Sequence, residues 1–182
     1  MGTRNLTIVT LKGQTKVAQY CQWDGYFTGQ GYTIAEFLKK VDLTKFKKKV
    51  KGLQWATSQE IKDSWTSVGA DPNSDSVSFE IADKHTVEYP EYSRDTGANI
   101  LDLIYKGKVT KLDNQIDFLN DSLFCEFAYE LDLDKKVVRI YVGFQKDAKG
   151  NYTKCKVFKT VKFKDFTKKL LKSLAKEEEE AA

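Results

Sequence analysis

The pattern of hydrophobic and polar positions predicts a β-hairpin at the start of the chain. Residues 6–11 form an apolar run, a Lys-Gly-Gln turn follows, and residues 15–23 return as a second strand. The faces of the second strand hold Val17, Gln19, Cys21 and Trp23 on one side and Ala18, Tyr20, Gln22 and Asp24 on the other. Because neither face is wholly apolar, we expect at least one polar side chain to point into a packed region or a pocket.

Apolar residues recur with helical spacing after this hairpin. Thr33 and Glu36 have the spacing of a capping box and predict a helix start, and a second helix is expected from Leu43 to a stop at Gly52. Thr57 and Glu60 repeat the capping-box spacing, and a third short helix is expected over 61–68, followed by a polar loop over 69–76.

The next segment mixes extended and helical signals. Residues 77–81 are predicted to form a strand, and 85–92 are predicted to be extended, with Pro90 excluded from a central ladder position. Asp95 is expected to cap a helix that ends near Gly107.

A period of two returns over 123–133, 137–145 and 152–163, which predicts a meander of strands. Asp165 is expected to cap a final amphipathic helix. Together these elements predict one α+β domain over residues 1–176, an antiparallel β-sheet system whose N-terminal hairpin and C-terminal meander are packed by helices. Residues 177–182 are predicted to form an acidic, disordered tail.

Composition narrows the class of protein. The 182 residues are 41% hydrophobic and 31% charged, as in a soluble globular domain, without an apolar run long enough to span a bilayer or a secretory signal. Three scattered cysteines and one histidine do not form a zinc motif, so we expect no metal, no cofactor and a cytoplasmic location. The net charge of +4 and the lysines between Lys45 and Lys51 are compatible with an anionic partner, but lysines spread along an amphipathic segment more often form a solvated helix face.

The densest candidate for a site is residues 19–31, QYCQWDGYFTGQG, in which glutamines, aromatic residues and glycines gather between a strand and a helix. Two stretches, 29–33 and 94–98, place glycine and small polar residues before a helix, where unpaired N–H groups bind anions. Candidate ligand-binding residues are Arg4, Gln19, Tyr20, Gln22, Trp23, Tyr26, Gly29, Gly31, Arg94 and Thr96. The structural alternatives are capped turns, a salt bridge for Arg94 and core packing for the aromatic residues.

Three carboxylates are candidates for acid–base chemistry: Asp24, Asp95 and Glu126. Glu126 would have a raised pKa on a buried strand, and would be an ordinary solvated residue on an exposed face. No Ser–His–Asp or Cys–His pattern can be assigned.

The segments MGTRNLTIV, KVAQYCQWDGYFTGQGYTIAEFL, SRDTGANILDLI and LFCEFAYELDLD resemble an uncharacterised family of bacteriophages and fungi, with an MGTR start and a QYxQWDGYPxGQG segment. This chain has Phe27 in place of the usual proline, and Cys21 in place of glycine. A sheet that starts at the N-terminus is similar to that of N-terminal hydrolases, but Gly2 cannot supply their nucleophile.

Three functional hypotheses follow. The first is a phage-type counter-defence protein that sequesters, and in one version hydrolyses, a nucleotide-derived immune signal; whether it is an enzyme and whether it forms a homo-oligomer stay open. The second is a nucleic-acid-binding module that uses Lys45–Lys51. The third is a protein–protein inhibitor of a host factor that uses exposed aromatic residues. None of them involves a membrane.

Overall fold

The computed structural model describes residues 2–74 and 76–181, without the side chains of residues 179 and 181. It has a main sheet of five strands: β1 (Asn5–Leu11), β2 (Gln14–Cys21), β5 (Phe127–Asp132), β6 (Val137–Val142) and β7 (Lys156–Lys162). A small second sheet pairs β3 (Gln54–Trp55) with β4 (Lys111–Leu112). The helices are α1 (Gln30–Lys40), α2 (Leu43–Lys51), α3 (Ser58–Ser67), α4 (Phe79–Glu88), α5 (Ile100–Lys106) and α6 (Lys168–Ala181). Short 3-10 helices are η1 (Pro90–Tyr92), η2 (Gly97–Asn99), η3 (Ile116–Asn120) and η4 (Phe163–Asp165).

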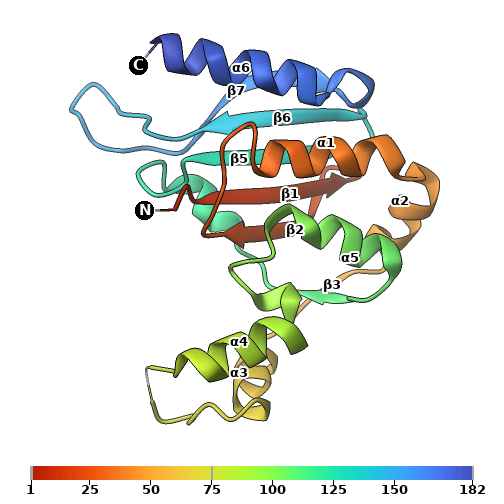
Figure 1. Cartoon of the computed structure of the whole chain (residues 1–182), viewed down its shortest axis with the longest axis vertical. Helices are drawn as coiled ribbons and strands as arrows, with labels where there is room; N and C mark the ends of the chain where they lie inside the picture. The colour runs from red at the N-terminus through yellow and green to blue at the C-terminus, as the bar shows by residue number, and fades with distance from the viewer. Residues whose placement is uncertain (1, 75, 182) are drawn as a thin grey trace.

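The strand order of the main sheet is β2-β1-β5-β6-β7 (Figure 1). Neighbouring strands are antiparallel except β1 and β5, which are parallel. The predicted α+β domain with a mostly antiparallel sheet is therefore confirmed, with one correction at its centre. The segment between β2 and β5 carries the chain across the sheet, and this long connection allows the parallel pair.

Helices α1, α5 and α6 cover one face of the sheet (Figure 1). Alternate residues of β1 supply both faces: Val9 and Leu11 pack under these helices, whereas Leu6 and Ile8 face a smaller cluster that includes residues of η3. All six residues of β5 are buried. The predicted meander therefore has no fully solvated face along β5, because this strand lies at the centre of the sheet and is covered on both sides.

The predictions of a strand over 77–81 and of extended structure over 85–92 are wrong. This segment contains α4 and η1, and the side chain of Ser78 caps α4 by accepting a hydrogen bond from the backbone N–H of Ile81. The physical reason is tertiary: His85 on α4 stacks on Trp65 of α3 with ring centroids 3.6 Å apart. The two helices form a hairpin that projects from the sheet (Figure 1).

Three helix starts also differ from the prediction. Helix α1 begins at Gln30, three residues before Thr33, and has no side-chain cap at Gly29. Helix α5 begins at Ile100 rather than near Asp95, because η2 intervenes. At the start of α6 the hydroxyl of Thr167, not Asp165, accepts a hydrogen bond from the N–H of Leu170.

The acidic segment predicted to be disordered is helical as far as Ala181. Leu171 and Leu174 anchor α6 in the main core. Glutamate has a high helix propensity, so the anchored helix continues through the glutamates. This correction matters for function, because two of these glutamates line a pocket.

Candidate functional site

Residues 19–31, which include most of the predicted site residues and the loop after β2, are held in place by hydrogen bonds within the protein. The side-chain amide of Asn5 donates to the carbonyl oxygens of Cys21 and Trp23. The side-chain oxygen of Gln30 accepts from the backbone N–H of Ala98 at 2.8 Å, and the Gln30 amide donates to Trp23 O. The polar residues of the loop therefore join β1, β2, α1 and the 93–98 segment.

Of the two glycines predicted as site residues here, Gly29 serves close packing. A Cβ on Gly29 would lie 2.1 Å from the carbonyl oxygen of Asp24, which no side chain tolerates, so backbone contact explains this glycine without a ligand. A Cβ on Gly31 would make ordinary contacts, at 3.4 Å, with Leu171 of α6 and the hydroxyl of Tyr129, so packing does not require glycine at that position.

Two of the three predicted catalytic carboxylates accept hydrogen bonds from aromatic side chains. Asp95 accepts from the indole N–H of Trp23 at 2.7 Å, and Asp24 accepts from the hydroxyl of Tyr26 at 2.8 Å. The hydrogen bond from Tyr26 to Asp24 raises the pKa of Tyr26. Each pair is exposed at the surface, so the structure does not bring Asp24 and Asp95 into one enclosed site.

Gln19 and Thr96 are buried and have backbone partners. The Gln19 amide donates to Ser93 O at 3.0 Å, and the Thr96 hydroxyl donates to Pro90 O. The first bond fixes β2 to the segment that leads into η2, and the second lies within that segment.

Arg4, Tyr20, Gln22 and Arg94 do come together. The Tyr20 hydroxyl donates to the side-chain oxygen of Gln22 at 2.5 Å. Burial raises the pKa of Tyr20, while the positive charges of Arg4 and Arg94 act to lower it. The backbone N–H of Gln22 donates to the carbonyl oxygen of Arg94 at 2.9 Å. The guanidinium of Arg4 also lies 4.6 Å from the centre of the Phe124 ring.

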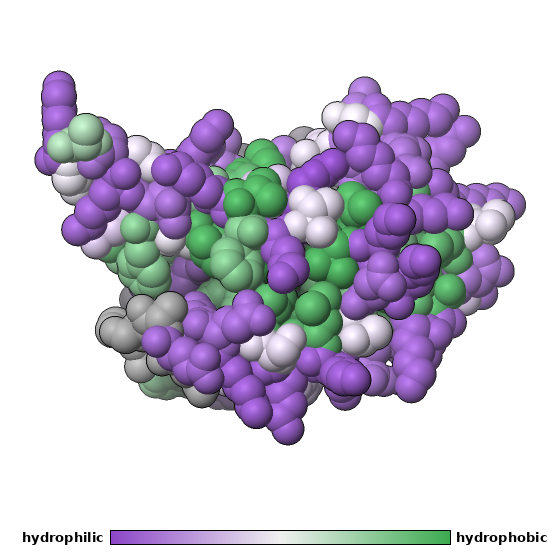
Figure 2. Space-filling model, turned by 90° about the horizontal axis from the view of Figure 1, so that it is seen from above, coloured by the Kyte–Doolittle hydropathy of each residue, from purple (hydrophilic) through white to green (hydrophobic). Residues whose placement is uncertain are grey.

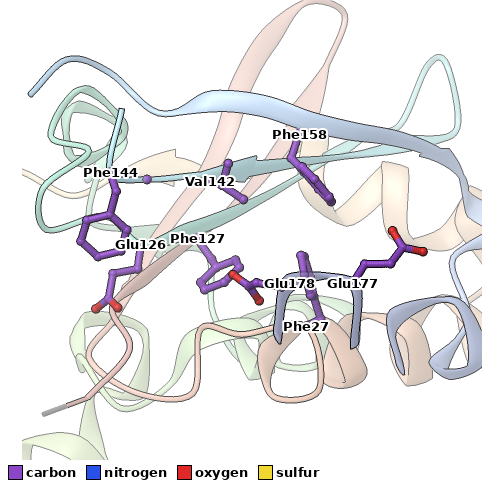
Figure 3. Close-up of a pocket in the computed structure, with 9 residues that line it drawn as sticks. Phe27, Glu126, Phe127, Val142, Phe144, Phe158, Glu177 and Glu178 are labelled. Carbon is purple, nitrogen blue, oxygen red and sulfur yellow. The ribbon is translucent and has the colours of Figure 1, made fainter. Parts of the chain in front are cut away.

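The strongest candidate site is a pocket of about 580 Å³ between the sheet and the C-terminal turns of α6 (Figure 3). Phe27, Phe127, Phe144 and Phe158 supply most of its wall. Phe27 packs edge-on against Phe127 and stacks on Phe158, with ring centroids 5.3 Å and 5.9 Å apart. Figure 2, which views the molecule from above, shows hydrophobic residues across the middle of that face, interspersed with hydrophilic ones.

Carboxylates are the charged groups of the pocket among the described residues. Glu126 lies at one end, Glu177 at the other, and Glu178 between them (Figure 3). Glu126 is the third predicted catalytic residue; it accepts a hydrogen bond from the backbone N–H of Arg4 at 3.1 Å, and the Arg4 side chain is 3.8 Å away. The lining therefore combines aromatic faces with negative charge, which favours a group that is both apolar and cationic.

The rim of the pocket carries backbone strain. Phe144 has a φ of 56°, in the left-handed region, and its side chain is 58% exposed. Residues 122–126 impose this conformation: the N–H of Gly143 donates to Glu126 O, and the N–H of Phe144 donates to Ser122 O. Because a bulky aromatic residue rarely adopts this conformation, the strain makes Phe144 a candidate functional position.

The sequence predictions missed most of this pocket. Phe144, Phe158, Glu177 and Glu178 were not among the predicted site residues, and of the nine lining residues only Glu126 was. One signal was present for the glutamates, because helical spacing places Glu177 and Glu178 on the same side of α6 as Leu174.

An ion-pair network on the opposite face of the sheet was also missed. Arg139 donates to Glu130 at 2.6 Å and to Asp132 at 2.7 Å, and Tyr141 donates to Glu130. Burial acts to raise the pKa of Asp132, but hydrogen bonds from Lys135 N and Arg139 hold that pKa below its usual range. The carboxylates of Glu130 and Asp132 are thus paired with groups in the sheet, and the network ties β5 to β6.

The described residues contain no cluster of His, Cys, Asp and Glu suited to a metal ion, and none of their helices is long and apolar enough to cross a membrane. The three cysteines are free and buried, as expected for small apolar residues. No family model, curated protein or solved structure matches the chain.

Proposed function

We propose that this protein is a binding protein whose pocket under α6 takes an apolar group that carries a positive charge. The observation that carries the proposal is the lining itself: four phenylalanines with Glu126, Glu177 and Glu178. An apolar cavity with a few polar groups is the usual form of a ligand site. This supports the third sequence hypothesis, recognition of a protein partner through aromatic residues, over capture of a nucleotide at the same place.

Charge distinguishes the two classes of ligand, a cationic apolar group and a nucleotide. A nucleotide brings negative phosphates, which the three carboxylates repel, whereas an ammonium or guanidinium group gains attraction from both the carboxylates and the aromatic faces. A titration with naphthylmethylammonium, naphthylacetate and ATP therefore tests the proposal. We expect the amine to bind at least about tenfold more tightly than the carboxylate, since tenfold corresponds to about 1.4 kcal/mol.

Two variants locate the binding. Phe158→Ala removes a wall of the pocket and is expected to weaken amine binding about tenfold, from the lost apolar burial. Phe79→Ala is the matched control, because Phe79 is a phenylalanine on α4 that is 91% exposed and lies outside the pocket. Equal affinity for the amine in the wild type and Phe158→Ala would overturn the proposal.

A nucleotide-derived signal remains a second candidate at another place, the surface formed by Arg4, Tyr20, Gln22 and Arg94. Its supporting observations are the hydrogen bond from the Tyr20 hydroxyl to the Gln22 side chain and the one from the Gln22 N–H to the Arg94 carbonyl oxygen. ATP and a cyclic dinucleotide are the probes, and Arg94→Gln is the variant. Stabilisation by either nucleotide that is lost in Arg94→Gln would favour this candidate and the counter-defence role predicted from the sequence.

The lysines at 45–51 lie on α2, where Phe46 and Val50 are buried and Lys48, Lys49 and Lys51 are exposed. This arrangement fits the solvated helix face that the sequence offered as the alternative. Lys45, Lys48 and Lys49 also line a pocket of about 430 Å³, and Lys45 Nζ lies 4.9 Å from the centre of the Tyr105 ring. The nucleic-acid hypothesis keeps these lysines as its candidate surface, and the salt dependence of nucleic-acid affinity tests it.

A further inference from the structure

The two edge strands of the main sheet, β2 and β7, differ in whether their outer backbone groups have hydrogen-bond partners. At the β2 edge, the N–H of Tyr20 donates to the Gln115 side chain, the N–H of Gln115 donates to Ala18 O, and the N–H of Gln22 donates to Arg94 O. At the β7 edge, β6 is the one strand partner in the described part of the chain, and the backbone of residues 157–161 has no hydrogen bond outside that ladder. The outer edge of β7 thus presents unpaired N–H and C=O groups.

This edge borders the pocket. Phe158 belongs to β7 and lines the pocket, and Val157 and Phe158 are each 49% exposed. A strand added beside β7 would direct every second side chain to the face on which the pocket lies. The seven residues of β7 span about 23 Å at the usual rise per residue, with a bulge at Phe158 where the register against β6 shifts.

The charges along β7 decide which strand fits. Lys156, Lys159 and Lys162 are its ionisable residues, and the strand contains no carboxylate. Two copies of this strand paired edge to edge would bring six lysines together, so the charges disfavour a second copy of the chain. They favour a foreign segment that carries acidic residues.

We propose that the natural ligand is an extended, acidic segment of another protein that pairs with the outer edge of β7 and inserts one arginine or lysine side chain into the pocket. This inference rests on the proposed function, since it names what presents the cationic group. Backbone hydrogen bonds along β7 supply affinity, and the pocket selects the inserted side chain.

The test uses three probes with the full chain. The first is a seven-residue peptide of alternating threonine and valine with a central arginine and a glutamate at each end. The second is the same peptide with alternate backbone amides N-methylated, which removes strand pairing and keeps the side chains. The third is naphthylmethylammonium, which tests the pocket alone.

Amide hydrogen exchange of β7 is the readout, together with affinity. We expect the first peptide to slow exchange of the outward-facing amides of β7 at least about tenfold, and N-methylation to abolish this protection and weaken binding. Phe158→Ala should weaken the first peptide, and Phe79→Ala should leave its affinity unchanged.

The remaining outcomes distinguish failure of the edge-pairing inference from failure of the proposed function. If both peptides bind equally without protecting β7, the edge-pairing inference is wrong and the pocket proposal stands. If the amine binds and neither peptide does, the inference again fails alone. If neither the amine nor either peptide binds, the proposed function fails together with the inference.

Discussion

The loop after β2 and the pocket under α6 use their polar and aromatic residues in opposite ways. Around the loop, Asn5 of β1, Gln19 of β2 and Gln30 of α1 make hydrogen bonds within the protein, and Gly29 admits neighbouring backbone. In the pocket, Phe144 is strained and exposed, and Phe158 stands on the open side of an edge strand. The comparison teaches that a dense, distinctive sequence motif can encode a junction of the fold, while a binding surface is assembled from residues that are unremarkable in sequence.

The largest expected effect is on the loop. Gly29→Ala places a Cβ against the carbonyl oxygen of Asp24, so we expect a loss of about 3 kcal/mol in the free energy of unfolding, the upper range for overpacking. Urea denaturation measures it. Gly52→Ala is the control: its nearest neighbour is 3.6 Å away and its φ is −87°, so a change within about 0.5 kcal/mol is expected. Equal stability of the two variants would contradict a packing role for Gly29.

The next effect tests whether the loop is a junction or a ligand surface. Gln30→Ala removes the acceptor of the Ala98 N–H and is expected to cost about 1–3 kcal/mol, the penalty of an unpaired buried donor. The affinity for naphthylmethylammonium should not change. Gln14→Ala, at an exposed position on β2, should leave stability unaltered. A stable Gln30→Ala protein with altered ligand binding would reverse the comparison.

A smaller effect of opposite sign is expected at the pocket. Phe144→Gly relieves the left-handed backbone and should stabilise the fold by about 0.5–1 kcal/mol, while amine binding weakens because a wall is lost. Lys136→Gly is matched, since Lys136 is exposed with a φ of 55°: it should gain similar stability without affecting binding. Destabilisation by Phe144→Gly would mean that this residue serves packing.

The smallest expected effect is a pH dependence of stability that arises in the α3–α4 hairpin. Like the loop, this hairpin has buried polar groups that are paired with each other. Burial lowers the pKa of His85, and its Nε2 lies 2.9 Å from the Ser64 hydroxyl. The unfolded chain then binds a proton more readily than the folded one, so stability is present above about pH 6.5 and declines as the pH falls through the lowered pKa.

His85→Phe keeps a ring against Trp65 and removes this titration. The difference in unfolding free energy between wild type and variant should therefore shrink as the pH falls from 7.5 to 5. Comparing the two proteins cancels the contribution of Glu91, whose pKa burial raises and whose effect on stability has the opposite sign. A constant difference across this range would show that His85 does not titrate differently on folding.

Local signals were sufficient for much of the fold. The hairpin of β1 and β2, the Thr57–Glu60 capping box, and the glycine stops after α2 and α5 follow the sequence rules. Each depends on residues within a few positions of one another, where backbone sterics and caps decide the outcome.

The candidate site was less predictable because its parts are distant in sequence. Phe27, Glu126, Phe158 and Glu178 become neighbours only when α6 crosses the sheet. The same holds for α4, which the sequence predicted as extended: its apolar residues have weak periodicity, and its helical state depends on packing against α3.

The sequence by itself determined the α+β class, the N-terminal hairpin and the placement of several helices, since alternation and capping are local properties of the chain. Only the tertiary structure decided that the glycine-rich loop is a hydrogen-bonded junction, that β5 lies parallel to β1 at the centre, and that an aromatic pocket and an open strand edge lie side by side. These depend on which surfaces bury one another, and burial is a property of the whole packed chain.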